Sequence, residues 1–155
     1  MNWVALLPAD RSQQGTLEVW IDGALRASYP CLGKADDAMA KQKGNPKRER
    51  LRPFGDTPLG TWTVRVGIRK REIDVYGPHP VLMLWPTGGE AMAAYSSPNR
   101  RSGIWIHGGR FNAAGGLRPT YGCVRVSDQT MAELHDFIAR RGLPTNFETK
   151  EPQNV

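Results

Sequence analysis

A chain of 155 residues with 39% hydrophobic residues is long enough for one domain with a buried core. Charged residues make up 23% and aromatic residues 8%, which are ordinary globular values that exclude a wholly disordered chain. The 21 Lys and Arg against 15 Asp and Glu give a net charge of +6. This charge favours a polyanionic partner, such as nucleic acid, anionic lipid or an acidic cell-wall polymer.

Short strands separated by Gly, Pro and Asp dominate the chain, whereas helical periodicity is scarce. Asp22 and Gly23 form the best two-residue turn and predict a hairpin between the second and third strands. We expect a mostly antiparallel sheet, folded as a sandwich or partial barrel. The predicted strands cover residues 2–7, 16–21, 25–29, 60–67, 72–76, 81–85, 103–107 and 123–126.

One long irregular stretch, residues 33–53, is rich in Lys and Arg, and a short helix is predicted within it over 36–42. Long irregular segments inside compact domains are often lids or binding loops. A solvated basic loop also fits this composition, so both interpretations stay open.

A longer helix is predicted after residue 127, where Ser127 can cap its N-terminus and Gly142 can end it. The chain is polar beyond about residue 145. We therefore expect a single domain over 1–145 and a frayed polar tail over 146–155. The apolar stripe of the helix contains Met131, Leu134, Phe137 and Ile138.

No apolar run approaches the roughly 18 residues that a membrane-spanning helix needs, so no membrane insertion is expected. Residues 1–10 lack a basic region, and their apolar stretch is too short for a signal peptide. We expect a protein that is made in the cytoplasm and either stays there or leaves without a cleavable signal.

His107 and Cys123 are the main candidates for chemistry, and each lies beside glycine and a β-branched run. Either residue alone is more often structural. A thiol, however, becomes a strong nucleophile only as thiolate, and an imidazole is the usual base. Gly122 would allow a tight turn that exposes the thiol and directs backbone amides toward an oxyanion, worth about 3–4 kcal/mol per donor.

Cys31 and Cys123 could form a disulfide, but this would consume the nucleophile, so two free thiols are expected. The three histidines and two cysteines show no paired spacing of the kind that binds zinc. We predict no metal and no cofactor. His79 and His135 match no motif and are interpreted as structural or surface residues.

Three segments together resemble the L,D-transpeptidase catalytic domain family, often called YkuD-like. They are TPLGTW at residues 57–62, IHG at 106–108 and TYGCVR at 120–125. The resemblance spans roughly residues 16–138. It implies a mostly β, sandwich-like fold, here with one C-terminal-region helix and the long basic loop, and this agrees with the strand pattern.

The resemblance also implies roles for individual residues. Cys123 would be the nucleophile and His107 the general base, with its ring held by a main-chain carbonyl near Gly108. Arg125 would hold the substrate or brace the thiolate, with a surface salt bridge as the alternative. The amides of Tyr121, Gly122 and Cys123 would form an oxyanion hole, and Thr120, Thr57 and Gly60 would join Arg125 in binding substrate. Tyr121 departs from the histidine more common at its position.

The implied reaction is cysteine-dependent acyl transfer on peptidoglycan tetrapeptide stems, with release of the terminal D-alanine. Transfer to an amine gives a cross-link, transfer to a D-amino acid gives exchange, and transfer to water gives L,D-carboxypeptidase activity. Tyr121 and the missing signal peptide resemble a type VI secretion effector subset. Such an effector would act in the periplasm or cell wall, with a secretion apparatus and an immunity protein as partners.

Two other functions stay open. A basic nucleic-acid-binding module would use the Lys/Arg-rich stretch with tryptophans as stacking platforms, although core packing is the expected fate of tryptophans in strands. A non-catalytic cell-wall-binding domain would keep the fold without turnover. The tryptophans are Trp3, Trp20, Trp62, Trp85 and Trp105.

Overall fold

The computed structural model describes residues 1–153, which form eight strands and four helices. The strands are β1 (Asn2–Leu6), β2 (Gly15–Ile21), β3 (Ala24–Cys31), β4 (Gly60–Val66), β5 (Leu82–Gly88), β6 (Trp105–His107), β7 (Val124–Arg125) and β8 (Asn146–Lys150). The helices are α1 (Asp37–Gln42), α2 (Ile73–Tyr76), α3 (Gly89–Tyr95) and α4 (Asp128–Arg141).

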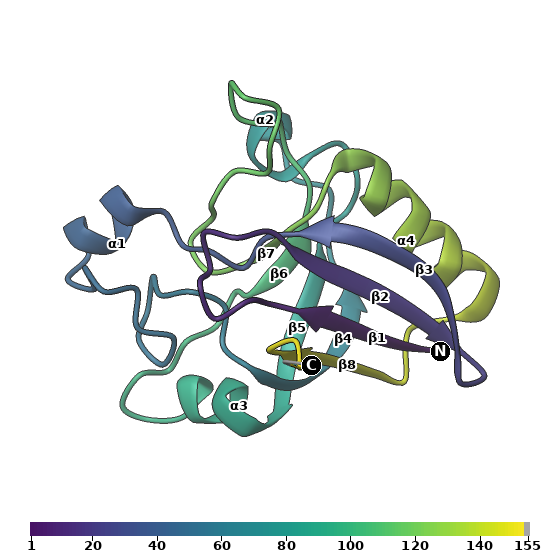
Figure 1. The fold of residues 1–155 in the computed structure, drawn as a ribbon, viewed down its shortest axis with the longest axis horizontal. Coiled ribbons are helices and arrows are strands. Elements are labelled where there is room, and N and C mark those ends of the chain that lie inside the picture. The colour runs from purple at the N-terminus through teal and green to yellow at the C-terminus, as the bar shows by residue number, and fades with distance from the viewer. Residues whose placement is uncertain (154–155) are drawn as a thin grey trace.

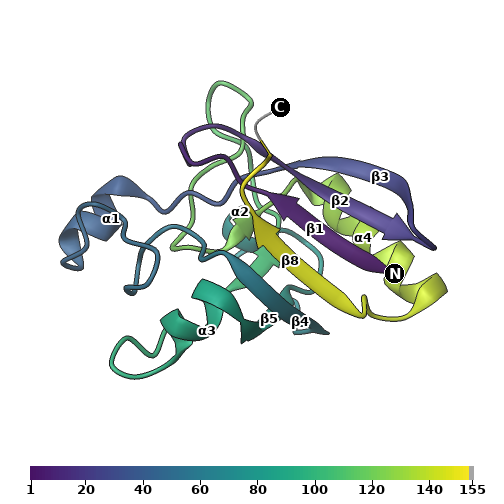
Figure 2. The ribbon, with the colours of Figure 1, turned by 60° about the horizontal axis from the view of Figure 1, so that its bottom comes forward.

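All eight strands belong to one curled, barrel-like sheet with the order β3-β2-β1-β8-β4-β5-β6-β7 (Figure 1). Two neighbouring pairs, β1–β8 and β6–β7, are parallel, and the other pairs are antiparallel. Helix α4 lies along β1–β3, whereas α1 projects at the opposite end of the molecule (Figures 1 and 2). The prediction of a mostly β, mostly antiparallel fold is confirmed.

Local signals place several elements as the sequence predicts. Asp22 and Gly23 have φ values of 52° and 76°, which suit the twisted two-residue turn between β2 and β3. Ser127 caps α4, because its hydroxyl accepts the Thr130 amide at 2.9 Å, and Gly142 ends that helix. Asp36 caps α1 in the same way through the amide of Met39.

The core fills one face of the sheet and is closed by the stripe of α4, in which Met131 and Leu134 are buried. Trp3 and Trp62 belong to this core, and Trp20 and Trp105 are half-buried. Within residues 1–153, Trp85, at 42% exposed, is the one exposed tryptophan. The predicted set of stacking platforms for nucleic acid is therefore not available.

Between β4 and β6 one prediction was wrong and one helix was missed. Residues 72–76 form the single turn α2 instead of a strand, with the Tyr76 amide bonded to Glu72 O at 2.9 Å. A short apolar run alone does not separate helix from strand, and here Ile73 and Val75 are exposed. Helix α3 was not predicted, and it buries only two small residues, Ala91 and Ala94.

The predicted polar tail was also wrong over most of its described length. Residues 146–150 form β8, a central strand between β1 and β4. Phe147 is fully buried, and the buried hydroxyl of Thr149 accepts from Trp62 Nε1 at 3.0 Å. One apolar residue in five gives no strand signal, so pairing with two neighbours decides this conformation. The domain thus extends to residue 150, and residues 154–155 of the predicted tail lie outside the described part.

Candidate active site

A cavity of about 640 Å³ at the β6–β7 end of the sheet contains both residues singled out for chemistry. Ile106 pairs with Val124 and His107 with Arg125 in the parallel β6–β7 ladder. Ile106 and Val124 point into the core, so the alternating residues face the other side. This register puts His107 and Cys123, which are distant in the sequence, in the wall of one cavity.

His107 is buried, and its Nδ1 lies 2.8 Å from the carbonyl oxygen of Gly108. Because a carbonyl only accepts, Nδ1 carries the proton and Nε2 keeps a free lone pair. Burial, and then the nearby Arg125 cation, lowers the pKa of His107 to about 4. The imidazole is therefore neutral at neutral pH, which is the state that a general base requires.

The thiol of Cys123 is held by the segment that leads into β6. Trp105 N donates to Cys123 Sγ at 3.4 Å, and Sγ donates to Gly103 O at 3.5 Å. Burial raises the pKa of Cys123 to about 11, an effect that Arg101 and Arg125 oppose. Within residues 1–153 the imidazole makes no hydrogen bond to this sulfur, and such bonds often form only when substrate is bound.

The two cysteines should differ strongly in reactivity. Both are free, but Cys31 has no exposed surface and burial raises its pKa to about 12. Burial also raises the pKa of Cys123, but Cys123 alone of the two lines a cavity, from which a reagent can reach the sulfur. Because the sulfur of Cys31 is closed off from solvent, we expect iodoacetamide to label Cys123 several-fold faster at pH 8, measured by peptide mass spectrometry. Equal rates would contradict the assignment of Cys123 to an accessible site.

The loop before Cys123 leaves two of the three predicted oxyanion-hole amides free. Gly122 has a φ of 114°, a value that other residues rarely adopt. Its amide donates to Thr120 Oγ1 at 3.0 Å, so it is occupied inside the loop and its predicted role is corrected. The amides of Tyr121 and Cys123 have no acceptor among residues 1–153. These two are the remaining candidate donors.

Three residues predicted to bind substrate have structural contacts instead. Thr120 lines the cavity, but its hydroxyl donates to Cys123 O at 2.9 Å. Thr57 is fully buried outside the cavity lining, and its hydroxyl donates to Gly122 O at 2.7 Å. Gly60 lies at the start of β4 with a φ of 146° and packs against Gly88. These predictions of direct substrate contact are not supported by the geometry.

Replacing Thr57 with valine should weaken the loop that carries the nucleophile. The change leaves Gly122 O without its strongest donor, and a buried unpaired acceptor costs about 1–3 kcal/mol. We expect the free energy of unfolding to fall by that amount in urea denaturation. Thr57→Ser, which keeps the hydroxyl, should retain most of the stability; equal losses in the two variants would show that the hydroxyl does not hold the loop.

Arg125 is buried and is not a surface salt bridge, so that alternative is wrong. Its Nη1 donates to Val75 O at 2.6 Å and to Gly108 O, and its Nε donates to Arg118 O at 3.1 Å. It therefore contacts the same carbonyl that orients His107. The turn after His107 is fixed further by Asp128, which accepts the Gly109 amide at 2.9 Å.

The basic stretch meets the cavity at both its ends. Asp36 lies in the lining, as do Pro53 and the adjoining Phe54, whose ring packs against Tyr121 with centroids 5.9 Å apart. The structure thus favours a wall of the site over a purely solvated loop. His135, by contrast, hydrogen-bonds to Pro80 O away from the cavity, in keeping with a structural role.

Arg101 also lines the cavity, although it belongs to no sequence motif that would have identified it. It is buried and donates to three backbone carbonyls of residues 50–56. Among residues 1–153 there is no cluster of three or more His, Cys, Asp or Glu side chains that could hold a metal ion. Nor does any helix in this range have the length and apolar character needed to cross a bilayer.

A buried thiol, a neutral imidazole with a fixed tautomer and two free loop amides thus lie together at one end of a curled β sheet. The family model of the L,D-transpeptidase catalytic domain (YkuD) matches residues 6–145, and the chain belongs to this family. The predicted family resemblance is confirmed. No curated protein matches the chain.

Of three similar solved structures, the first supports the fold of this chain. Bd1075 of Bdellovibrio bacteriovorus superimposes with a TM-score of 0.57 at 16% identity, over 98% of this chain and 48% of its own. An L,D-transpeptidase of Xylanimonas cellulosilytica gives 0.42 at 16% identity, over 96% of this chain and 60% of its own. Mycobacterium tuberculosis L,D-transpeptidase 1 gives a TM-score of 0.38 at 13% identity, over 95% of this chain and 60% of its own. The chain thus spans about half to three-fifths of these structures.

Proposed function

We propose that this chain catalyses acyl transfer on peptidoglycan tetrapeptide stems, with Cys123 as nucleophile and His107 as general base. The observation that carries the proposal is the shared cavity, in which a neutral imidazole with a free Nε2 faces the same space as the thiol. Membership of the L,D-transpeptidase catalytic domain family supports the choice of substrate class.

The groups in the cavity account for each proton and electron pair of the reaction. Nε2 of His107 accepts the thiol proton as Cys123 Sγ attacks the carbonyl carbon of the L-centre of diaminopimelate. The resulting oxyanion accepts from the amides of Tyr121 and Cys123. The C–N bond then breaks, its electron pair leaves with the D-alanine nitrogen, and His107 returns the proton to that nitrogen. A thioester on Cys123 remains.

The charge of the cavity suits a substrate that carries carboxylates. Its lining contains four arginines and one carboxylate, Asp36. Guanidinium groups bind carboxylates with two parallel hydrogen bonds, and a stem peptide offers several carboxylates. The arginines are Arg100, Arg101, Arg118 and Arg125.

The thioester is resolved by an acceptor, and each acceptor leaves a different product. An amine of a second stem gives a cross-link, a free D-amino acid gives exchange, and water gives a tripeptide. The test is mass spectrometry of purified tetrapeptide muropeptides incubated with the protein, with and without a D-amino acid. Unchanged muropeptides in all mixtures would refute the proposal and favour a non-catalytic wall-binding domain.

We further propose that the site acts in the periplasm or cell wall of a target cell, as a type VI secretion effector with an immunity partner. Support comes from Tyr121, which lines the cavity where the family more often has histidine. Expression directed to the periplasm of a susceptible bacterium should be toxic, and the Cys123→Ala variant should be harmless. If the wild type is harmless there but active when purified, the effector role fails and the enzymatic proposal stands.

A further inference from the structure

Arg101 is a buried cation held rigidly by backbone. Its side chain is only 6% exposed. Nη1 donates to Arg50 O at 2.5 Å and to Asp56 O at 2.9 Å, and Nη2 donates to Gly55 O at 3.0 Å. Three carbonyls therefore fix the plane and the position of the guanidinium.

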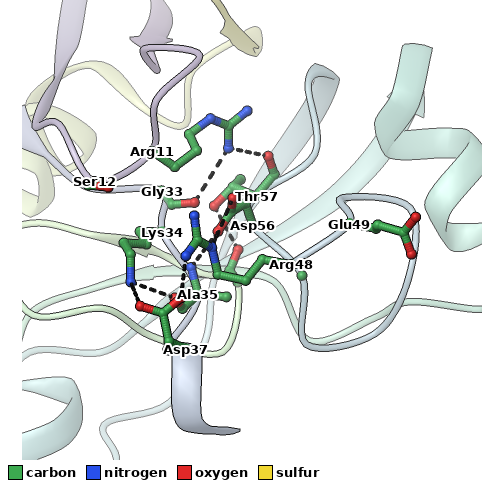
Figure 3. Close-up of polar contacts among 12 residues, drawn as sticks. Arg11, Ser12, Gly33, Lys34, Ala35, Asp37, Arg48, Glu49, Asp56 and Thr57 are labelled. Atoms are coloured by element: carbon green, nitrogen blue, oxygen red, sulfur yellow. Dashed lines mark hydrogen bonds and ion pairs between the residues drawn. The ribbon is translucent and has the colours of Figure 1, made fainter. Parts of the chain in front are cut away.

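This cation has no carboxylate partner within the described residues, whereas Arg50 and Arg48 each have one. Arg50 pairs with Glu90 at 2.9 Å, and Arg48 pairs with the Asp56 carboxylate at 3.2 Å. Figure 3 shows that carboxylate beside Arg48, and Asp56 offers Arg101 only its backbone oxygen. Burying a charge without a counter-ion is costly, and burial lowers the pKa of Arg101 to about 10. A negative charge that forms close to Arg101 would offset part of this cost.

The guanidinium lies directly against the nucleophile loop. A Cβ atom on Gly122 would lie 2.1 Å from Arg101 Nη2 and 2.6 Å from Gly55 O, so the guanidinium packs directly against the residue before Cys123. Arg101 also begins the segment whose Gly103 carbonyl and Trp105 amide bind the Cys123 sulfur. The cation thus faces the place where the proposed reaction develops negative charge.

We propose that Arg101 is a positioning residue whose fixed charge stabilises the Cys123 thiolate and, through it, the transition state of the proposed acyl transfer. The missing counter-ion is the thiolate itself, which exists only during reaction. An interaction that appears only as charge develops lowers the barrier instead of tightening substrate binding. The thiolate part of this inference needs no substrate, so it can be tested even if the proposed function fails.

Other charged or titratable groups face the same cavity and define the background for a pH measurement. Arg125 and His107 lie on the strands beside Cys123, and Tyr76 comes from α2. Arg118 and Tyr121 lie on the loop before β7. Asp36 and Arg100 complete the set, and none of these is altered in the variants below.

The test measures iodoacetamide labelling of Cys123 against pH, by peptide mass spectrometry, in Arg101→Gln and Arg101→Lys. Loss of the charge should raise the pKa of Cys123 by at least about one unit. A higher pKa also makes the remaining thiolate more nucleophilic, so labelling at pH 8 should fall about threefold to fourfold per unit. Arg101→Lys keeps the charge and should stay within about twofold of the wild type.

Arg11→Gln is the matched control. Arg11 is also buried and bonds to backbone of the same region, with Nη1 donating to Thr57 O at 2.7 Å and to Gly33 O at 3.4 Å (Figure 3). It does not line the cavity. We expect Arg11→Gln to lower thermal stability and leave the labelling profile of Cys123 unchanged.

The outcomes distinguish an effect of the Arg101 charge from an effect of its hydrogen bonds to the backbone. The proposal is supported if Cys123 is labelled more slowly in Arg101→Gln, while the labelling rates in Arg101→Lys and Arg11→Gln stay close to wild type. An unchanged profile in folded Arg101→Gln overturns it, as does an equal loss in the Gln and Lys variants. If Arg101→Gln does not fold, Arg101→Lys decides: retention of labelling supports the proposal, and a loss of threefold or more in the folded variant overturns it.

Discussion

Replacing Cys123 with alanine is expected to abolish thioester formation and D-alanine release, lowering turnover by about 10⁴-fold or more. Cys123 is the one cysteine in the cavity of the described chain, and the other residues there offer no thiol to take its place. The measurement is release of D-alanine from a tetrapeptide, together with intact-protein mass spectrometry to detect the acyl adduct.

Cys31→Ala provides the control for this experiment. Cys31 ends β3 inside the core and does not line the cavity, so its loss should cost packing and no chemistry. The variant should form the adduct at the wild-type rate. Full activity in Cys123→Ala, or loss of the adduct in Cys31→Ala, would remove Cys123 from the role of nucleophile.

The second large effect is on pH dependence. Activity should persist well below the ordinary pKa of histidine, because burial and Arg125 lower the pKa of His107 to about 4. Protonation destroys the base, and the imidazole protonates only as the pH falls through that value. The acid limb of kcat/KM for D-alanine release should therefore lie near pH 4, with a roughly tenfold loss per pH unit below it.

Two variants check the cause of this limb. His107→Gln should lower kcat/KM by about 10²–10⁴-fold and remove the limb, since no base is left to titrate. Arg125→Gln removes a nearby positive charge and should move the limb to higher pH, with a further loss of rate because Gly108 O loses a donor. A wild-type limb near pH 6.5 would show that the imidazole is not held in the buried neutral state described above.

Without substrate, the two candidate catalytic groups of the site are both uncharged. The pKa of Cys123 is raised and that of His107 is lowered, both mainly by burial, so thiol and imidazole are uncharged near neutral pH. The two buried arginines then oppose only the cost of forming thiolate during reaction. In the proposed reaction, proton transfer from the thiol to His107 would therefore be part of the chemical step.

The local sequence determined the turns and helix ends, which depend only on neighbouring residues. The Asp22–Gly23 turn, the Ser127 cap and the Gly142 stop act within a few residues of chain, so their positions could be predicted. The sequence also shows directly that a histidine at 107 precedes a cysteine at 123 and that each lies beside glycine. These features indicated the family and the pair of residues to examine.

Only the tertiary structure decided features that depend on distant contacts. Residues 146–150 become a central strand because β1 and β4 pair with them from both sides. Gly122 loses its predicted role because Thr120 occupies its amide. Arg101 acquires its place beside Cys123 because carbonyls some 50 residues away hold its guanidinium. The pKa values follow from burial, which no local pattern encodes, since it is set by what the rest of the fold places around each group.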